Sequence, residues 1–368
     1  MGAMGNQLSR VKAYRLGFYG VLSAWLLLCT LPSILLTSTA AASVTPPLPY
    51  RVLIIDDGRH LQGKKLIQNL TTHLAQLGFQ QDKNLKLIHQ LCKTSAAELS
   101  TTLLEQFEAL QPQLVIANGT IAALQAKQLA ATRNIPLLFM SVPAPVEAGL
   151  VQQTGLSTQG FITGRSDAVT PAIRLSMVHK LLRTSHGKGK IRLGLIHSHS
   201  PAALADLQQL KRAVQKFPQI ELISHALPKQ VSCADLPQFL AALQQAIKQL
   251  DGRIDYWWSS HGPMSQLAEV QALFTQHSDH IVVYGVNQKM VERGALLRIS
   301  PDEAGMGREM AELTSAILHG TLPGHIPVAM PKEIALGFNL TTAEQIALVI
   351  PSELMELARG QLSHTVRR

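Results

Sequence analysis

The sequence is poor in cysteine, in aromatic residues and in charged residues. It has 3 cysteines in 368 residues, and no two of them stand in a C-x-x-C spacing, which excludes a zinc or redox framework of that type. Charged residues make up 15% of the chain and hydrophobic residues 46%. This balance predicts a globular protein with sizeable cores, and the length is sufficient for two domains.

The sequence signatures of common enzymes are also missing. There is no G-x-S-x-G elbow, no H-E-x-x-H, no Walker loop, and no G-x-G-x-x-G after a predicted strand. Since nothing in the sequence supports an enzyme, we predict no catalytic residues and no cofactor.

The formal net charge of +9 is mild and spread along the chain. The densest basic run, residues 179–192, contains no aromatic residue that could stack on a base. We therefore expect no nucleic-acid partner. A monomer is expected as well.

The first 42 residues have the three parts of a secretory signal peptide. Three cations precede an apolar run, residues 16–36, and small residues follow it, with Ala40 and Ala42 at an A-x-A cleavage signal. We expect export to the periplasm and removal of residues 1–42. The alternative is an uncleaved N-terminal membrane anchor, because the apolar run approaches the roughly 20 residues that span a bilayer.

Short aliphatic runs alternate with amphipathic stretches along the rest of the chain. The runs that predict strands are residues 51–56, 85–91, 113–118, 135–142, 191–198, 220–225, 254–260 and 280–286. The stretches between them have apolar residues at i, i+3, i+4 and i+7, which predicts helices. Continuous apolar strands joined through helices are typical of parallel sheets covered by helices on both faces.

The predicted strand–helix units fall into two groups of about four. Residues 143–167 separate the groups and are rich in glycine and proline, with no helical period. We therefore predict an α/β protein of two doubly wound parallel-sheet lobes joined by a hinge. Cys92 and Cys233 fall on different lobes, which favours two unpaired thiols over a disulfide.

Small polar residues follow several predicted strands, where parallel α/β sheets bind ligands. The candidate ligand-binding residues are Asp57, Gly58, Asn118, Gly119, Thr120, Ser141, Ser198, His199, Ser260 and His261. Backbone N–H groups at the start of a helix can bind an anion, and hydroxyl groups can bind polar ligands. Each residue alone can be explained as a helix cap, but the repetition at four strand ends favours a ligand cleft.

The same strand ends suggest two other functions. The paired acids at 56–57 suggest a phosphorelay receiver, but the third strand ends in Asn118 where a receiver has its phosphoacceptor acid. His197, His199 and His261 could converge on a metal ion. No carboxylate or thiolate stands near them in sequence. A metal-binding protein is therefore only an alternative to the ligand cleft.

Three blocks of the chain resemble the substrate-binding proteins of ABC importers. Residues 115–151 resemble the family segment in which G-T opens a helix and a D-P-V-x-x-G-L-V motif follows. Residues 160–182 resemble its G-N-V-T-G-x-S segment, and residues 294–358 its closing region with N-x-x-x-A-x-x-x-x-x-x-I-P. The similarity is to the branch with a type I periplasmic-binding fold that is associated with tryptophan and other aromatic amino acids.

The resemblance implies two lobes between which the chain crosses three times. They would comprise residues 43–167 with 300–325, and residues 168–299 with 326–368. It also implies a periplasmic protein that presents a small solute to an ABC permease in the inner membrane. The alternative is a sensor subunit that passes ligand occupancy to a separate sensor kinase.

The sequence departs from the family pattern at positions that would bind an amino acid. Ala144 replaces the acid of D-P-V, and Phe161 replaces the Asn before V-T-G. The carboxylate-facing residues 119–120 and Ser141 are kept, and Asp57 is the one acid left for an ammonium group. We therefore expect a small polar or anionic solute, such as an amino acid relative, and not a standard aromatic amino acid.

Overall fold

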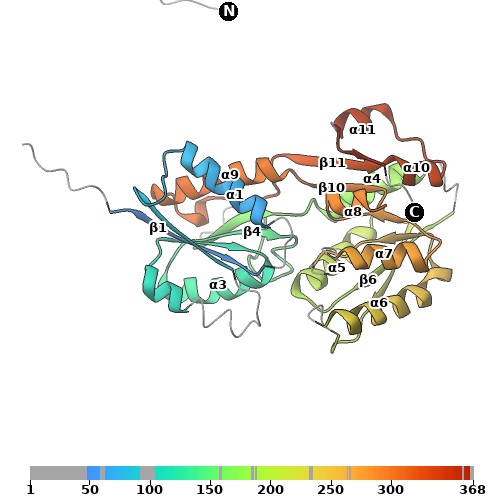
Figure 1. Cartoon of the computed structure of the whole chain (residues 1–368), viewed down its shortest axis with the longest axis horizontal. Helices are drawn as coiled ribbons and strands as arrows, with labels where there is room; N and C mark the ends of the chain where they lie inside the picture. Colours follow the sequence, from blue (N-terminus) through green and yellow to red (C-terminus); the bar gives the residue numbers. More distant parts are fainter. Residues whose placement is uncertain are drawn as a thin grey trace, which may run out of the picture. The chain divides into compact units, whose positions relative to one another are not determined.

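The computed structural model contains two β-sheets with helices on their faces (Figure 1). It describes residues 48–58, 63–91, 104–156, 160–183, 186, 189–231, 235–262, 264, 267–358 and 360–364. The predicted signal peptide, Cys92 and Cys233 lie outside the described residues. Among the helices of the described part, none is long and apolar enough to cross a membrane.

The first sheet has five parallel strands in the order β2-β1-β3-β4-β5. They are β1 (Tyr50–Asp56), β2 (Leu85–Leu91), β3 (Leu114–Asn118), β4 (Leu137–Val142) and β5 (Ile162–Ser166). The helices that accompany them are residues 104–110, α1 (Gly63–Gln76), α3 (Thr120–Arg133) and α9 (Glu303–Leu318). This sheet and these helices are called the first lobe below.

The alternation of side chains along β1 explains why helices cover both faces of this sheet. Val52 and Ile54 belong to the apolar cluster that includes residues of α1 and α9. Leu53 and Ile55 belong to the cluster that includes residues of α3. Successive strand residues point to opposite faces, so an unbroken apolar run needs a cover on each. Figure 1 shows α1 and α9 on one side of the sheet and α3 on the other.

The second sheet has seven strands in the order β12-β11-β10-β9-β8-β6-β7. They are β6 (Ile191–His197), β7 (Ile220–Ala226), β8 (Tyr256–Trp258), β9 (Val282–Tyr284), β10 (Leu297–Pro301), β11 (Ile334–Asn339) and β12 (Leu362–Ser363). Its helices are α4 (Pro171–Leu182), α5 (Pro201–Val214), α6 (Leu236–Leu250), η1 (Asp251–Arg253), α7 (Ala268–His277), α8 (Gln288–Glu292), α10 (Leu340–Gln345) and α11 (Ser352–Leu357). This sheet and its helices are called the second lobe.

The predicted strands are all present, although β8 and β9 are shorter than expected. Two features differ from the prediction. β10 and β11 pair antiparallel, so the second sheet is mixed and not purely parallel. The predicted turn-rich segment 143–167 contains β5, a buried strand whose sequence ITGRS has no apolar run to reveal it. β5 is a strand because its backbone pairs with β4, and pairing of this kind is decided by tertiary structure.

The chain passes between the two sheets at three places. It leaves the first lobe after β5, returns after β10 to form α9, and leaves again before β11. Within the first lobe, the Arg165 Nε lies 2.5 Å from the Glu309 Oε1 on α9, and Arg165 also pairs as a β-bridge with Ala329. The exact lobe boundaries stay a proposal.

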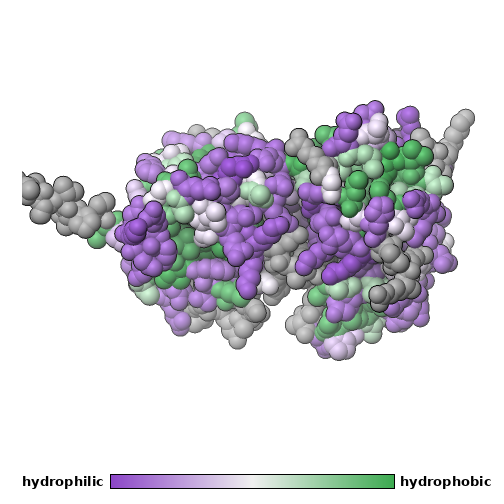
Figure 2. Space-filling model, turned by 45° about the horizontal axis from the view of Figure 1, so that its top comes forward, coloured by the Kyte–Doolittle hydropathy of each residue, from purple (hydrophilic) through white to green (hydrophobic). Residues whose placement is uncertain are grey.

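The surface is mostly hydrophilic on the face seen in Figure 2. Hydrophobic atoms gather there in the region of the C-terminal helices α10 and α11. Two apolar side chains of this region are strongly exposed, Val349 at 85% and Leu357 at 61%.

Candidate functional site

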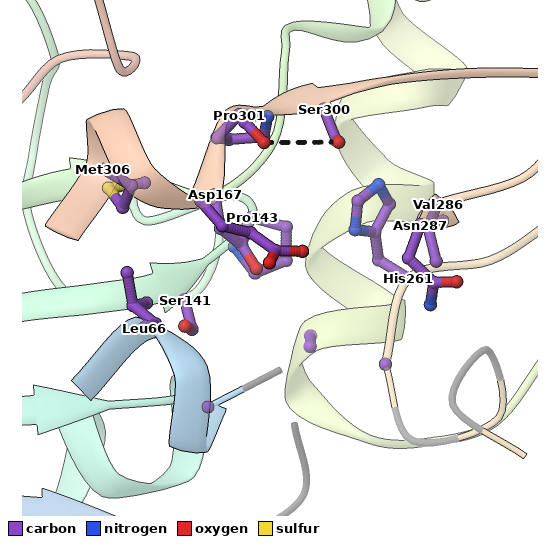
Figure 3. Close-up of a pocket in the computed structure, with 14 residues that line it drawn as sticks. Leu66, Ser141, Pro143, Asp167, His261, Val286, Asn287, Ser300, Pro301 and Met306 are labelled. Atoms are coloured by element: carbon purple, nitrogen blue, oxygen red, sulfur yellow. Dashed lines mark hydrogen bonds between the residues drawn. The ribbon is translucent and has the colours of Figure 1, made fainter. Parts of the chain in front are cut away.

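A cavity of about 100 Å³ lies between the two lobes (Figure 3). It is lined from the first lobe and the adjoining chain passages by Gly63, Leu66, Ser141, Pro143, Asp167, Glu303 and Met306, and from the second lobe by Ala202, His261, Gly262, Val286, Asn287, Ser300 and Pro301. Many of these residues stand at or just after the carboxyl ends of β4, β5, β8, β9 and β10. Ligands of open α/β sheets bind in this position.

The lining combines acids, hydroxyls and apolar side chains. Asp167 and Glu303 are its two carboxylates, and both stand where the chain passes between the lobes. Figure 3 shows the Asp167 side chain and the His261 ring extending into the space from opposite sides. Leu66 and Met306 form an apolar wall on the first-lobe side. Such a mixture suits a small ligand that has both a polar and an apolar part.

Ser141 reaches the cavity through an unusual backbone conformation. Its φ is +58°, in the left-handed region that favours glycine, and the register of β4 on β5 shifts between Phe139 and Val142. Its side chain is buried, and the residue is 5% exposed. Strained backbone is found mainly at functional sites, where the surrounding structure compensates for its cost. The conformation therefore supports a ligand-binding role for Ser141.

A buried ion pair lies behind His261. The Arg174 Nη2 is 2.7 Å from the Asp206 Oδ1, and the two side chains are 0% and 1% exposed. The other carboxylate oxygen of Asp206 accepts the backbone N–H of His261 at 3.5 Å. Burial acts to raise the pKa of Asp206, but the charge of Arg174 outweighs it and holds the pKa below its ordinary value. Asp206 is therefore ionised and fixes the segment that carries His261.

The guanidinium group of Arg174 lies close to two aromatic rings. It lies 5.3 Å from the ring centroid of Tyr284 and 5.8 Å from that of Trp258. The two rings stack with their centroids 4.5 Å apart. Burial raises the pKa of the Tyr284 phenol to about 12, so this ring is neutral at any physiological pH. The two aromatic side chains thus serve the core of the second lobe, as their fully buried positions indicate.

Of the residues predicted from the sequence, Ser141 and His261 line the cavity. Asp57 is buried at the end of β1, and its carboxylate lies against Gly119 at the start of α3. A Cβ added to Gly119 would lie 2.3 Å from the Asp57 Oδ2, so only glycine leaves room for this carboxylate. Gly119 also has a φ of +104°, which side chains rarely adopt.

The neighbouring acid has a structural role. Asp56 accepts a hydrogen bond from the Gly58 N–H at 2.9 Å, and its Oδ2 lies 3.5 Å from the His89 Nε2. Burial acts to raise the pKa of Asp56, but the hydrogen bonds from His89 and Gly58 outweigh it and hold the pKa below its ordinary value. Asn118, which lies opposite Asp56 on β3, is buried, and its side chain has no hydrogen-bond partner among the described residues. Gly58 takes a positive φ of 65° at this turn.

The other predicted residues make local contacts at the strand ends. The Ser198 hydroxyl donates to the Ser200 Oγ at 3.1 Å, and the Ser260 hydroxyl donates to the His261 carbonyl oxygen at 3.0 Å. The His199 Nε2 lies 2.8 Å from the Leu227 carbonyl oxygen. Thr120 is 3% exposed, and within the described part of the chain its hydroxyl has no hydrogen-bond partner. Ligand binding by these four residues stays a prediction.

The histidines that suggested a metal site are not gathered around one point. The rings of His197 and His199 lie 6.2 Å apart, whereas His261 lies at the cavity, beside Tyr284. Among the described residues, no group of three or more His, Cys, Asp or Glu side chains is placed to hold a metal ion.

His197 should make the stability of the protein depend on pH. Burial lowers its pKa below the ordinary 6.5, and the charges of His199, Lys211 and His225 lower it further. The unfolded chain therefore takes up a proton that the folded chain resists, so the free energy of unfolding should fall as the pH drops below about 6.5. Urea denaturation between pH 8 and 5 would measure this loss.

The His197→Gln variant should have a flatter dependence over the same pH range. His364→Gln, which removes one exposed imidazole, is the matched control and should keep the slope of the parent protein. Equal slopes for His197→Gln and the parent would show that other groups cause the pH dependence.

Sequence reasoning missed four polar residues that line the cavity: Asp167, Asn287, Ser300 and Glu303. Asn287 could have been found, because it follows β9 and caps α8 through its Oδ1, which accepts the Met290 N–H at 3.0 Å. Asp167, Ser300 and Glu303 stand next to β5 and β10, which the sequence pattern did not reveal. Their place at the cavity follows from the chain passages between the lobes.

Comparisons with known proteins agree with this architecture. Residues 59–361 match a family model described as ABC transporter substrate binding protein. Among curated proteins, the chain is similar to a tyrosine-binding protein of Clostridioides difficile (strain R20291), with 24% identity over 273 residues, which cover 73% of this chain and 72% of the relative.

Two similar solved structures show the fold. A conserved domain protein of Vibrio cholerae has a TM-score of 0.68 and 23% identity, over 86% of this chain and 99% of its own. An ABC domain from Streptococcus pneumonia, solved in complex with L-Trp, has a TM-score of 0.69 and 18% identity, over 85% of this chain and 99% of its own. They confirm the predicted α/β architecture of two lobes.

Proposed function

Since the chain belongs to the family of ABC transporter substrate-binding proteins, whose members are not enzymes, we propose that it is the extracytoplasmic component of an importer. It captures a small solute between its lobes and delivers it to an ABC permease. The observation that carries the proposal is the cavity formed by strand ends of both lobes and by residues beside the passages between them. A solute bound there would stabilise the closed arrangement of the lobes.

The names of the relatives support a solute of amino-acid size. One relative is described as a tyrosine-binding protein, and one similar structure holds L-Trp. The mixed polar and apolar lining of the cavity is compatible with a ligand of this size. We further propose export through the signal peptide at residues 1–42, which fits a role outside the cytoplasm.

Uptake measurements would test the importer role. Deleting the gene should abolish high-affinity uptake of the solute that binds the exported protein, and the gene supplied on a plasmid should restore it. Thermal-shift screening would identify that solute, because a ligand at 100 times its Kd stabilises a protein by about 2.7 kcal/mol. Unchanged uptake by the deletion strain, with binding intact, would contradict the importer role and favour a sensor.

An ion pair between the lobes should contribute to closure. Glu147 follows β4 in the first lobe, and its Oε1 lies 2.5 Å from the Arg212 Nη2 on α5 of the second lobe. The Gln209 side chain also donates to Glu147 at 3.3 Å. The Glu147 side chain is only 6% exposed. Its carboxylate charge therefore needs these two partners from the second lobe.

Replacing Arg212 by methionine should therefore weaken solute binding by about 3- to 10-fold, the equivalent of roughly 1 kcal/mol. The loss should come mostly from faster dissociation, measured by stopped-flow fluorescence with a solute from the screen. Arg133→Met is the matched control, because it removes an Arg–Glu pair that lies within the first lobe. Equal affinities for the Arg212 and Arg133 variants would show that the interlobe pair does not contribute to closure.

A further inference from the structure

We propose that Arg298 is a positioning residue that sets the specificity of the cavity: it orients the hydroxyl of Ser300 so that this hydroxyl donates to a carboxylate of the solute. This inference rests on the proposed function, since it concerns the solute captured in the same cavity. The sequence-based expectation placed the carboxylate of the solute at residues 119–120 and Ser141, in the first lobe. Ser300 belongs to the second lobe.

Arg298 and Ser300 lie on the same face of β10. They are two residues apart on a strand, so their side chains point to the same side of the second sheet. Ser300 stands nearer the carboxyl end of the strand and lines the cavity, whereas Arg298 is outside the lining. Both are buried, with exposed fractions of 5% for Arg298 and 8% for Ser300. Figure 3 shows the Ser300 side chain on the same side of the cavity as the His261 ring.

The surroundings of Arg298 hold its guanidinium group beside Ser300. The Nη1 donates to the Ser300 Oγ at 3.0 Å, and the Nη2 donates to the Gln361 Oε1. Gly337 lies opposite Arg298 on β11, and a Cβ added there would lie 3.3 Å from the Arg298 Cγ. Glycine at this position therefore leaves room for the stem of the arginine.

The hydrogen bond from Arg298 decides what the Ser300 hydroxyl can do. A hydroxyl has one donor hydrogen and two acceptor lone pairs, and a guanidinium group can only donate. The Ser300 Oγ therefore accepts from Arg298, and its own hydrogen points to another partner. The Pro301 carbonyl oxygen is 3.4 Å away, beyond the roughly 2.5–3.0 Å of a normal O–H···O bond. The hydrogen can thus turn to an acceptor atom of a solute in the cavity.

The guanidinium group of Arg298 is buried without a carboxylate bonded to it. Within the described part of the chain, its hydrogen bonds go to two neutral groups, the Ser300 hydroxyl and the Gln361 amide oxygen. Its Nε has no hydrogen-bond partner there. Arginine stays protonated in proteins, so a full positive charge stands behind the Ser300 hydroxyl. A carboxylate that accepts from this hydroxyl would bring a compensating negative charge close to Arg298.

A comparison with Arg174, in the same lobe, shows that the charge of Arg298 is only partly compensated. Burial acts to lower the pKa of Arg174, but the charge of the bonded Asp206 outweighs it and raises the pKa. Burial also lowers the pKa of Arg298, and the charges of Glu303 and Asp302 oppose this without reversing it. The structure thus leaves Arg298 in need of a further negative group, and the cavity is where a solute can supply one.

The acids of the lining determine how such a solute is oriented. Asp167 and Glu303 stand beside the passages between the lobes, and they would repel a carboxylate that approached them. Glu303 also pairs with Lys65, whose Nζ lies 3.1 Å from the Glu303 Oε2. A solute with both charges would therefore direct its carboxylate to Ser300 and its ammonium group toward the acids.

Pairs of compounds that differ only at the carboxylate test the proposal. L-Tryptophan and L-tryptophanamide share a ring and an ammonium group, and L-tyrosine with L-tyrosinamide forms a second pair. Isothermal titration of the exported protein at about pH 6 keeps all four ammonium groups charged. In the pair that binds more tightly, the amino acid should bind at least about 10-fold more tightly than its amide, because hydrogen bonds to charged groups are stronger. This ratio is called the carboxylate preference.

Two titration results would overturn the inference. The first is an amide that binds as tightly as its amino acid, or more tightly. The second is binding of neither amino acid.

Arg298→Met removes the charge and the bond to Ser300 and fills similar space. It should weaken binding of the amino acid by about 10-fold and binding of the amide by less than about 3-fold, so the carboxylate preference falls. Ser300→Ala should lower the preference too, and Arg298→Met should cost less affinity when added to Ser300→Ala than in the parent. Arg253→Met, at an exposed arginine of the second lobe outside the cavity, is the matched control and should keep the preference.

The carboxylate preference separates positioning from a merely structural role. If Arg298 only supported the fold, Arg298→Met would weaken the amino acid and the amide equally, and the proposal would be wrong. Ser300→Ala gives a second test that does not depend on the folding of Arg298→Met, and circular dichroism checks the fold of each variant. An unchanged preference in folded Ser300→Ala would also overturn the proposal.

Failure of this inference can be told from failure of the proposed function. An amide that binds as tightly as its amino acid would reject the role of Arg298 and leave a protein that still captures a solute. Unchanged solute uptake in the deletion strain would reject the importer and leave the carboxylate preference as measured.

Discussion

Replacing Asp206 by alanine should lower the free energy of unfolding by about 3–5 kcal/mol. The change would leave the guanidinium of Arg174 fully buried without its carboxylate partner, since the two side chains are 0% and 1% exposed. Two of its nitrogens, Nε and Nη1, already have no hydrogen-bond partner among the residues that the structure describes. The contacts with Tyr284 and Trp258 cannot replace a carboxylate, because each cation–π contact contributes only about 2 kcal/mol even when desolvated. Guanidinium chloride denaturation would measure the loss.

The double variant Arg174→Met with Asp206→Leu separates charge burial from packing. It removes both charges and fills similar space, so it should regain most of the stability lost in Asp206→Ala. Glu333→Ala is the control for an exposed ion pair, because Glu333 and its partner Arg308 are about half exposed, and it should cost less than about 1 kcal/mol. A loss of that small size in Asp206→Ala would contradict the stabilising role of the buried pair.

Replacing Gly119 by alanine should destabilise the first lobe by about 2–4 kcal/mol. The added Cβ would lie 2.3 Å from the Asp57 Oδ2, and the backbone φ of +104° is already unfavourable for alanine. Either the carboxylate or the start of α3 must then move. Urea denaturation would give the stability, and circular dichroism would show whether the fold is retained.

Two further variants separate the steric contact from the backbone strain. Gly78→Ala introduces a Cβ at a φ of +92° with nothing within 4 Å, so it reports the strain alone and should cost less. Gly119→Ala combined with Asp57→Ala removes the contact and should approach the effect of Gly78→Ala, after subtraction of the effect of Asp57→Ala alone. If the double variant lost as much stability as the two single variants together, the contact between Asp57 and the added Cβ would not contribute to the destabilisation by Gly119→Ala.

Asp57 and Gly119 also show how far the sequence could predict the site. Both were predicted as ligand-binding residues because they follow adjacent strands, and the structure does bring them together. Their contact is with each other, and among the described residues neither contributes to the cavity lining. A strand end can serve a ligand or its own lobe, and the sequence pattern is the same in both cases.

The missed acids illustrate the opposite error. Asp167 stands in a segment predicted as a turn-rich hinge, and Glu303 stands after β10, which was not predicted as a strand. Neither had a sequence pattern of its own. Both reach the cavity because the chain passes between the lobes at these points, and these passages depend on contacts between residues far apart in the chain, such as Arg165 with Glu309.

The sequence by itself determined the strands β1 to β4 and β6 to β9, the helices between them and the family. It could do so because these features depend on local periodicity and on the order of short motifs. Tertiary structure alone decided the antiparallel β11, the strand in the hinge and the acids at the cavity. These depend on which backbones pair and which lobe surfaces meet, and a periodic pattern carries no information about partners distant in sequence.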